Sequence, residues 1–213
     1  MEVVELLERY PEVWRGAVRH PFLDAVREGT LPAGAFEAWL AQDCLFVADL
    51  LVFQSRLLAR APRLAQAVLA GGLVALEAEL TWFEDRAEER GLELGAPRHP
   101  ATTAYRDFLL SLEREGYAAG ITALWALELA YLEAWRSAAP GHPDYREFVE
   151  HWTTPEFADY VAGLEAAAGS ALESGGQEER GGVEAAFLGV ARLERDFWDM
   201  AWSAAREGPG GDR

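Results

Sequence analysis

The sequence predicts an all-α protein with one domain. Apolar residues recur at intervals of three and four along nearly every segment, as they do on one face of an amphipathic helix. No segment sustains the alternation of apolar and polar residues that marks a half-buried strand. The chain has 213 residues, of which 50% are hydrophobic, and this is enough to bury one sizeable core. We therefore expect one helical domain over residues 1–207 and a disordered tail over residues 208–213.

Four helices are expected in the first part of the chain, over residues 2–9, 12–28, 32–60 and 63–90. Pro32 stands in the first turn of the third helix, where the missing N–H of a proline removes no hydrogen bond. Gly29 and Gly91 directly follow the apolar periodicity of the second and fourth helices and are expected to close them.

Five further helices are expected over residues 101–115, 118–138, 143–151, 155–174 and 182–206. Gly116 closes the first of these. Pro155 stands at a first-turn position, and Thr153 with Glu156 forms a capping-box pattern before the same helix. The glycine-rich segment 173–182 is expected to be a flexible connector and not a domain linker, because a single helix follows it.

Charge and cysteine content exclude several classes of function. The chain has 19 arginines, no lysine and 36 acidic residues, and its net charge is −17 at pH 7. Such a surface repels the phosphates of nucleic acids and of anionic lipids, so we expect no nucleic-acid and no membrane partner. The absence of lysine excludes a Schiff-base lysine and a P-loop lysine. The sole cysteine, Cys44, allows no intrachain disulfide and indicates a cytoplasmic protein, as does the lack of a signal peptide.

Three acidic residues stand where the helix periodicity calls for an apolar one. Asp43 completes the apolar stripe of helix 32–60, Glu128 lies at the centre of the stripe in helix 118–138, and Glu194 holds the same place in the last helix. An ionised carboxylate taken out of water without partners is strongly destabilising. A single such acid is as readily explained by a buried ion pair, whereas three together favour a functional site.

Clustered carboxylates suit two kinds of chemistry. A dinuclear metal site in a helical bundle needs a histidine three residues after a glutamate on facing helices, and no histidine stands in that relation to these acids. We therefore expect no metal and no cofactor. General acid–base catalysis, in which neighbouring carboxyls have their pKa values pushed apart, fits the residues better.

Aromatic residues accompany the three acids. Phe46 follows Asp43 by one turn, Tyr131 follows Glu128 by three residues, and Tyr105 lies on the apolar face of its own helix. Core packing explains most of the eight tryptophans. Aromatic faces beside a buried acid nevertheless suit a flat heterocycle, which stacks on the rings while the acid binds its amino group.

Blocks along almost the whole chain resemble the TenA / thiaminase II family. The N-terminal block runs from His20 to Pro32 and on to Asp43, and the closing block begins at Glu194 and includes Phe197 and Trp198. Further matching blocks are Pro100 to Tyr105, Tyr131, and Tyr145 to Phe157. The resemblance implies a haem-oxygenase-like helical bundle, a homotetramer or dimer, and a small aminopyrimidine substrate of thiamin salvage. It also implies that Asp43 binds the aminopyrimidine, Tyr105 helps to hold its ring and Glu194 takes part in proton transfer.

One departure from the family pattern concerns the nucleophile. Leu127 stands where many members carry a cysteine that adds to the pyrimidine ring, and the sequence is similar to the Cys-lacking branch, which has a glutamate at the position of Glu128. Phe46 and Trp152 replace tyrosines that are frequent in the Cys-bearing branch. Cys44 lies about 100° around its helix from Asp43 and is expected to be a small hydrophobe. Cleavage of thiamin by ring addition is therefore not expected.

The sequence thus predicts hydrolysis by water. The pyrimidine is expected to stack among Tyr105, Phe46 and Trp152, with Tyr131 also in the binding site and Asp43 on the ring nitrogen and exocyclic amine. Glu128 activates water or protonates the departing amine, and Glu194 holds the complementary protonation state. The Cys-lacking branch implies two substrates, 4-amino-5-aminomethyl-2-methylpyrimidine and its N-formyl derivative. Which of the two is the preferred substrate stays open, although hydrolysis of a formamide suits carboxylate chemistry more naturally.

Other functions remain open on the sequence. The same scaffold could carry or sense a heterocycle without catalysis. An oxidative quinone-forming enzyme and a di-iron oxygenase are less compatible with the shortage of positioned histidines. The sequence also leaves open whether Glu79, which falls near Leu76, Trp82 and Phe83, belongs to the site or to a solvated edge.

Overall fold

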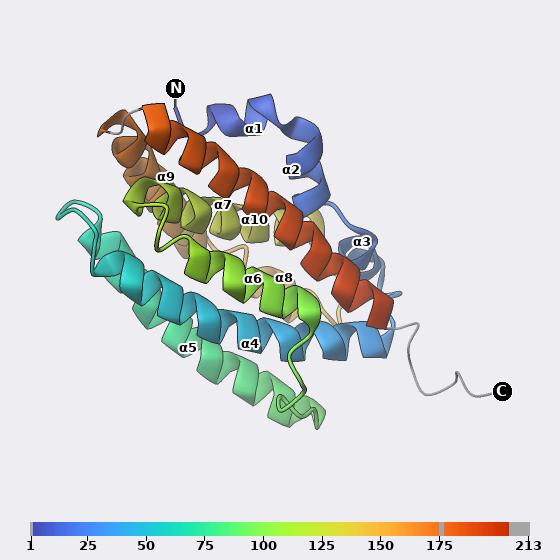
Figure 1. Cartoon of the computed structure of the whole chain (residues 1–213). Helices are drawn as coiled ribbons and strands as arrows, with labels where there is room; N and C mark the ends of the chain where they lie inside the picture. Colours follow the sequence, from blue (N-terminus) through green and yellow to red (C-terminus); the bar gives the residue numbers. More distant parts are fainter. Residues whose placement is uncertain (1, 175–176, 205–213) are drawn as a thin grey trace.

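The computed structural model describes residues 2–174 and 177–204, and this part of the chain contains helices and no strand, which confirms the all-α class. Figure 1 shows the helices as a bundle of long and short members. The helices are α1 (Glu5–Arg9), α2 (Pro11–Val18), α3 (Pro21–Glu28), α4 (Ala33–Leu58), α5 (Gln66–Arg90), α6 (Pro100–Ser111), α7 (Tyr117–Ser137), α8 (Arg146–His151), α9 (Pro155–Ser174) and α10 (Gln177–Ala204).

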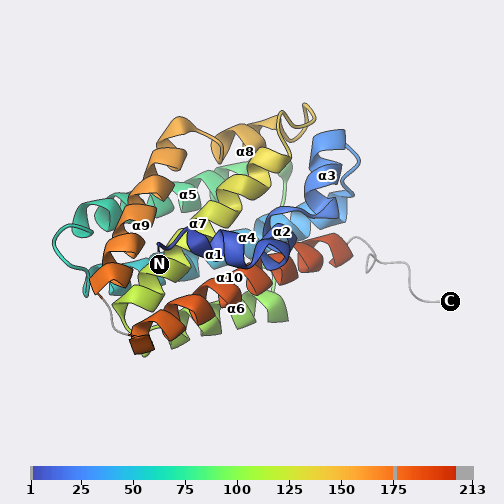
Figure 2. The ribbon, with the colours of Figure 1, turned by 90° about the horizontal axis from the view of Figure 1, so that it is seen from above.

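Helix α7 is the central helix of the bundle. It packs against α2, α9 and α10, while α4 packs against α5, α6 and α10 (Figure 2). Every residue from Ala118 to Glu128 is buried, so this half of α7 is enclosed on all sides. A helix that is apolar all round has to lie inside a protein, and the alanines and leucines of α7 meet that condition. Glu128, at the end of this run, is consequently surrounded by other helices.

The expected helix 12–28 is wrong, because the chain forms α2 and α3 with a break between them. Pro21 disfavours the helical conformation of the residue before it, and His20 is extended, with φ −151° and ψ 148°. The ring Nδ1 of His20 then accepts a hydrogen bond of 3.1 Å from the backbone N–H of Phe22, which caps α3. A proline in the first turn of one helix thus ends the preceding helix.

The start of α9 is capped one residue later than the capping-box pattern predicts. Pro155 is the first helical residue, as expected. The hydroxyl of Thr154 accepts a bond of 3.1 Å from the N–H of Phe157, whereas the Thr153 hydroxyl donates to the carbonyl of Val149. Because Thr154 directly precedes the helix, its oxygen is the one within reach of the free N–H groups.

The expected connector 173–182 is also wrong for most of its length. Helix α9 continues to Ser174 and α10 already begins at Gln177, so Gly181 and Gly182 are helical. A glycine weakens a helix by about 1 kcal/mol relative to alanine, and the packing of α10 on α7 outweighs this. The expected domain end at residue 207 and the tail 208–213 lie outside the described residues.

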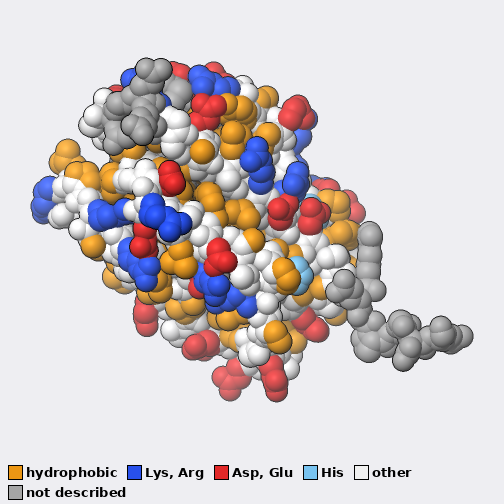
Figure 3. Space-filling model, viewed as in Figure 1, with side chains coloured by type: hydrophobic (Ala, Val, Ile, Leu, Met, Phe, Trp, Pro, Cys, Tyr) orange, Lys and Arg blue, Asp and Glu red, His pale blue; other side chains and the backbone are white. Residues whose placement is uncertain are grey.

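Charged side chains of both signs are scattered among hydrophobic and other side chains on the face drawn in Figure 3. Arginines pair with acids between elements, as Arg98 does with Asp49 and Arg56 with Glu113. None of the described helices combines the length and the apolar character that a membrane span requires.

Candidate active site

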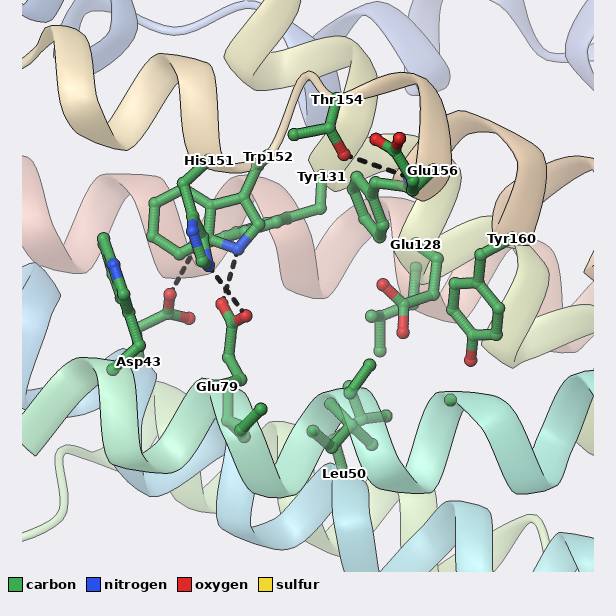
Figure 4. Close-up of a pocket in the computed structure, with 18 of the residues that line it drawn as sticks. Asp43, Leu50, Glu79, Glu128, Tyr131, His151, Trp152, Thr154, Glu156 and Tyr160 are labelled. Carbon is green, nitrogen blue, oxygen red and sulfur yellow. Dashed lines mark hydrogen bonds and ion pairs between the residues drawn. The ribbon is translucent and has the colours of Figure 1, made fainter.

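A cavity of about 500 Å³ lies between α4, α5, α7 and the stretch that runs from the end of α8 into the first turns of α9 (Figure 4). This volume is within the range of small-molecule sites. Aromatic and aliphatic side chains form most of the wall, among them Phe46, Leu50, Leu76, Trp82, Leu127, Tyr131, Trp152, Phe157 and Tyr160. The acidic and basic side chains in the wall are Asp43, Glu79, Glu128, His151 and Glu156, and no arginine is among the described residues that line the cavity.

Asp43 projects from α4 and is buried, with 2% of its surface exposed. The hydroxyl of Tyr131, on α7, donates a hydrogen bond to its Oδ2. Burial raises the pKa of Asp43 well above its usual value, and the charges of Glu79 and Glu194 act in the same direction, whereas the Tyr131 bond lowers it. Burial is the largest of these effects, so the Asp43 carboxyl holds a proton more tightly than an exposed aspartate does.

Glu128 lies in the same wall and is 6% exposed. It has no hydrogen-bond partner among the residues that the structure describes. Burial raises its pKa to about 8, assisted by the charges of Glu79, Glu194 and Asp43. A carboxyl with a pKa in this range exchanges protons readily near neutral pH, which suits a general acid or base.

Tyr105 and Glu194 are paired outside the cavity wall. The Tyr105 hydroxyl donates a hydrogen bond of 2.6 Å to Oε1 of Glu194, and both side chains are buried. Burial raises the pKa of Glu194 to about 7, although the Tyr105 bond acts against this. The pair adjoins the cavity through Phe46, because the ring centroids of Phe46 and Tyr105 are 4.6 Å apart. Five of the seven expected site residues therefore line the cavity, and Tyr105 and Glu194 do not.

Glu79 belongs to the cavity wall and not to a solvated edge. Its Oε1 accepts a bond of 2.6 Å from the indole N–H of Trp152, and its Oε2 lies 2.9 Å from Nε2 of His151. The imidazole of His151 stacks on Trp82, with ring centroids 4.1 Å apart and planes inclined by 11°. Glu79 could be suspected because it lies between Leu76 and Phe83 on the inner face of α5. His151 lies within the family-like block Tyr145 to Phe157, but its residue type and spacing indicated no role.

Tyr160 and Gln54 form a second polar pair that sequence analysis missed. The Tyr160 hydroxyl, at the cavity wall, donates a bond of 3.1 Å to Oε1 of Gln54, and Nε2 of Gln54 donates one of 2.9 Å to the Leu69 carbonyl. Gln54 is fully buried. Gly72 makes room for both side chains, because a Cβ at this position would overlap Gln54 and Tyr160.

Cys44 is half-buried and does not line the cavity. Burial raises the pKa of its thiol to about 11, with contributions from the charges of Asp43 and Glu84. A thiol with so high a pKa is protonated at neutral pH, and the thiolate is the nucleophilic form. Both the position and the raised pKa of Cys44 therefore indicate a packing residue.

The groups that face the cavity can transfer protons and bind polar atoms of a flat ligand. Their carboxyls differ in surroundings, since burial raises the pKa of Asp43 and Glu128, whereas Glu79 is in contact with the Trp152 indole N–H and the His151 imidazole. Within residues 2–174 and 177–204, no three histidine, cysteine or acidic side chains are arranged to hold a metal ion. This arrangement suits acid–base chemistry on a ring that stacks between aromatic walls.

Comparison with known proteins identifies similarity over most of the chain. The model of the family described as TENA/THI-4/PQQC matches residues 7–204. The "Probable bifunctional TENA-E protein" of Glycine max is 31% identical over 208 residues, which cover 92% of this chain and 90% of that protein. An aminopyrimidine aminohydrolase of Halalkalibacterium halodurans is 26% identical over 210 residues, with coverage of 93% and 94%.

A solved structure of a TenA homologue from Pyrococcus furiosus has the same architecture. Its TM-score is 0.91 at 32% sequence identity, and the match covers 95% of this chain and 100% of that one. The helical bundle expected from the sequence resemblance is thereby confirmed.

Proposed function

The chain belongs to the TENA/THI-4/PQQC family, and from this premise we propose that it is a hydrolase of thiamin salvage that cleaves a C–N bond of an aminopyrimidine. The relative from Halalkalibacterium halodurans, an aminopyrimidine aminohydrolase, supports this reaction class. The proposed substrates are 4-amino-5-aminomethyl-2-methylpyrimidine and its N-formyl derivative. A cytoplasmic location and a homo-oligomeric state belong to the same proposal.

Binding of the ring uses the aromatic wall and Asp43. The pyrimidine stacks among Phe46, Tyr131 and Trp152, which line the cavity, and Tyr105 supports Phe46 from behind. Asp43 binds the ring nitrogen and the exocyclic amine. Because the pKa of Asp43 is raised, its carboxyl can donate a proton to the ring nitrogen while its other oxygen accepts from the amine.

Glu128 carries the chemistry in this proposal. The observation behind it is a carboxyl that is buried in the cavity wall, has no hydrogen-bond partner among the described residues and has a pKa of about 8. In its carboxylate form Glu128 takes a proton from water as the water oxygen attacks the substrate. The same proton then passes to the departing nitrogen. General acid–base assistance of this kind is typically worth about 10²- to 10⁴-fold in rate.

The atoms balance for both substrates. With the formamide, water adds to the formyl carbon, the C–N bond breaks, and the products are formic acid and the aminomethylpyrimidine. With the protonated aminomethyl compound, water replaces ammonia at the methylene carbon, and the products are the hydroxymethylpyrimidine and ammonium. Neither reaction requires a thiolate, and Leu127 occupies the position of the cysteine in the Cys-bearing branch.

Glu194 has a supporting role. Its negative charge is one of the causes that raise the pKa of Glu128, and its hydrogen bond from Tyr105 keeps the carboxyl in place. We propose that Glu194 sets the protonation state of Glu128 without touching the substrate.

The test is hydrolysis of both pyrimidines, with the aminomethyl and hydroxymethyl products followed by chromatography. Glu128→Gln should lower kcat by about 10²-fold or more, because the amide can neither take nor give the proton, while the substrates still bind. Cys44→Ala is the matched control and should keep the wild-type rate. Tight binding without turnover by the wild-type protein would favour a non-catalytic carrier, and loss of activity in Cys44→Ala would contradict the cysteine-independent reaction.

A further inference from the structure

We propose that Glu79 receives a protonated amine in the cavity and thereby makes the protein select the cationic aminomethyl substrate over its neutral N-formyl derivative. The identity of the two ligands rests on the proposed function. The role of Glu79 rests on the position of this carboxylate and on the charges around it.

The Glu79 carboxylate is held in place from two sides. Trp152 donates to one oxygen at 2.6 Å, and Nε2 of His151 lies 2.9 Å from the other. The stacking of His151 on Trp82 fixes the imidazole in turn. A carboxylate has about four acceptor sites, and these contacts use two of them. Glu79 therefore offers free acceptor positions in a fixed orientation, which is what binding of an N–H donor requires.

The charges around Glu79 favour a cation. Figure 4 shows its carboxylate between those of Asp43 and Glu128, pointing into the same space. Burial raises the pKa of Asp43 and of Glu128, whereas the Glu79 carboxyl accepts the indole N–H of Trp152 and lies within hydrogen-bond distance of the His151 imidazole. His151 is the basic side chain in the described cavity wall, and Glu156 adds a further acid. No arginine lines the described cavity, so an anionic ligand such as a phosphate ester finds no matching group.

The two substrates differ in the group that Glu79 would meet. The aminomethyl compound carries an ammonium group at neutral pH, and its N–H donors match the free acceptor sites of a carboxylate. The N-formyl derivative is neutral: it keeps one amide N–H donor without a positive charge, and its formyl oxygen is an acceptor that a carboxylate repels. A single charge on Glu79 consequently separates two ligands that share the same ring.

The substitution Glu79→Gln tests this difference. Glutamine keeps the length of the side chain, its oxygen still accepts from Trp152, and its NH₂ can donate to His151 in the other tautomer. A hydrogen bond to a charged group is typically worth about 1.5–3 kcal/mol, so kcat/KM for the aminomethyl substrate should fall about 10- to 100-fold, chiefly through KM. On the plateau of its pH profile, kcat/KM for the formyl substrate should stay within about threefold of wild type.

Glu77→Gln is the matched control, since Glu77 lies on the same helix but is exposed. It should leave both substrates unaffected. Equal losses of the two substrates in Glu79→Gln would overturn the inference, because they would show that Glu79 merely positions Trp152.

Binding measured by calorimetry separates this inference from the proposed function. If the wild-type protein turned over neither pyrimidine, the proposed function would fail, yet a preference for the cation that is lost in Glu79→Gln would still support the inference. On the wild-type protein alone, affinity for the aminomethyl compound should fall as the pH passes the pKa of its own amine, and affinity for the formyl compound should not follow. An equal response of both ligands would contradict the role of Glu79.

Discussion

Glu128 makes the pH dependence of the proposed reaction predictable. As a base toward water it has to be deprotonated, and its pKa is about 8. We therefore expect kcat/KM for the neutral formyl substrate to rise with pH and to level off above about pH 8. Rates measured on both sides of this value check the prediction. A fall through the same region would instead assign Glu128 the role of a general acid.

The charge of Glu79 affects the same pH profile of the formyl substrate. It is one of the causes that raise the pKa of Glu128, so its removal lowers that pKa. In Glu79→Gln the rise of the formyl profile should move to lower pH, whereas in Glu77→Gln it should not move. An unchanged midpoint in Glu79→Gln would show that the two carboxyls are not coupled.

The sequence identified buried acids better than it identified their partners. Helix periodicity placed Asp43, Glu128 and Glu194 on apolar faces, and all three are buried in the structure. Periodicity assigns a residue to the inner face of a helix, but it does not say what lies opposite. The Glu79 and His151 contact joins residues 72 positions apart, and the packing of α5 against the α8–α9 segment, which creates it, is a property of the folded chain.

At the scale of the helix, α5 offers a pair of glycines that should respond in opposite ways to the same substitution. In Gly71→Ala the new methyl group meets nothing within 4 Å, so the better helix propensity should raise the free energy of unfolding by about 0.5–1 kcal/mol. In Gly72→Ala the methyl group overlaps Gln54 and Tyr160, and overpacking typically costs about 1–3 kcal/mol. Urea unfolding of the two variants measures both changes.

The Gly72 variant should also lose activity, since the displaced Tyr160 lines the cavity. Gly71→Ala is its control for activity as well as for stability. Equal stability of the two variants would mean that the Gln54–Tyr160 pair moves aside without cost.

Helices were easier to predict than the points at which they break. The ends of the long helices α4, α5 and α7 lie within three residues of their expected positions. The break at Pro21 was missed because the apolar spacing continues across it, although the backbone before a proline cannot easily be helical. The predicted start of α10 is too late because the low helix propensity of Gly181 and Gly182 indicated a connector at these positions. Their helix is stabilised by packing on α7, which local sequence does not encode.

At the scale of the whole molecule, three buried carboxyls that the proposed function requires lower the stability of the fold. Asp43, Glu128 and Glu194 all have raised pKa values, and burial is the first cause in each case. The folded protein thus retains protons that the unfolded chain releases, and stability falls as the pH rises through that interval. A site that needs titratable acids in an apolar wall consequently limits the stability of the fold.

Glu128→Gln should therefore stabilise the protein while it removes activity. The unfolded chain releases the Glu128 proton near the ordinary value of 4.5, and the folded protein releases it at about 8. Between these values the unfolded state binds fewer protons, so the wild type loses stability with rising pH, and the glutamine variant lacks this loss. The difference in free energy of unfolding should be small at pH 4, grow to at most about 5 kcal/mol near pH 8, and then remain level.

Urea unfolding at a series of pH values measures this difference. Glu165→Gln, on the exposed side of α9, is the matched control and should show no such growth. If the Glu128→Gln difference were the same at every pH, the glutamate would carry no excess proton in the folded state. Water would then surround Glu128 in the cavity, and its pKa would be close to that of an exposed carboxyl. The midpoint of the pH profile of hydrolysis would move to the same lower pH. The stability and kinetic measurements therefore have to agree.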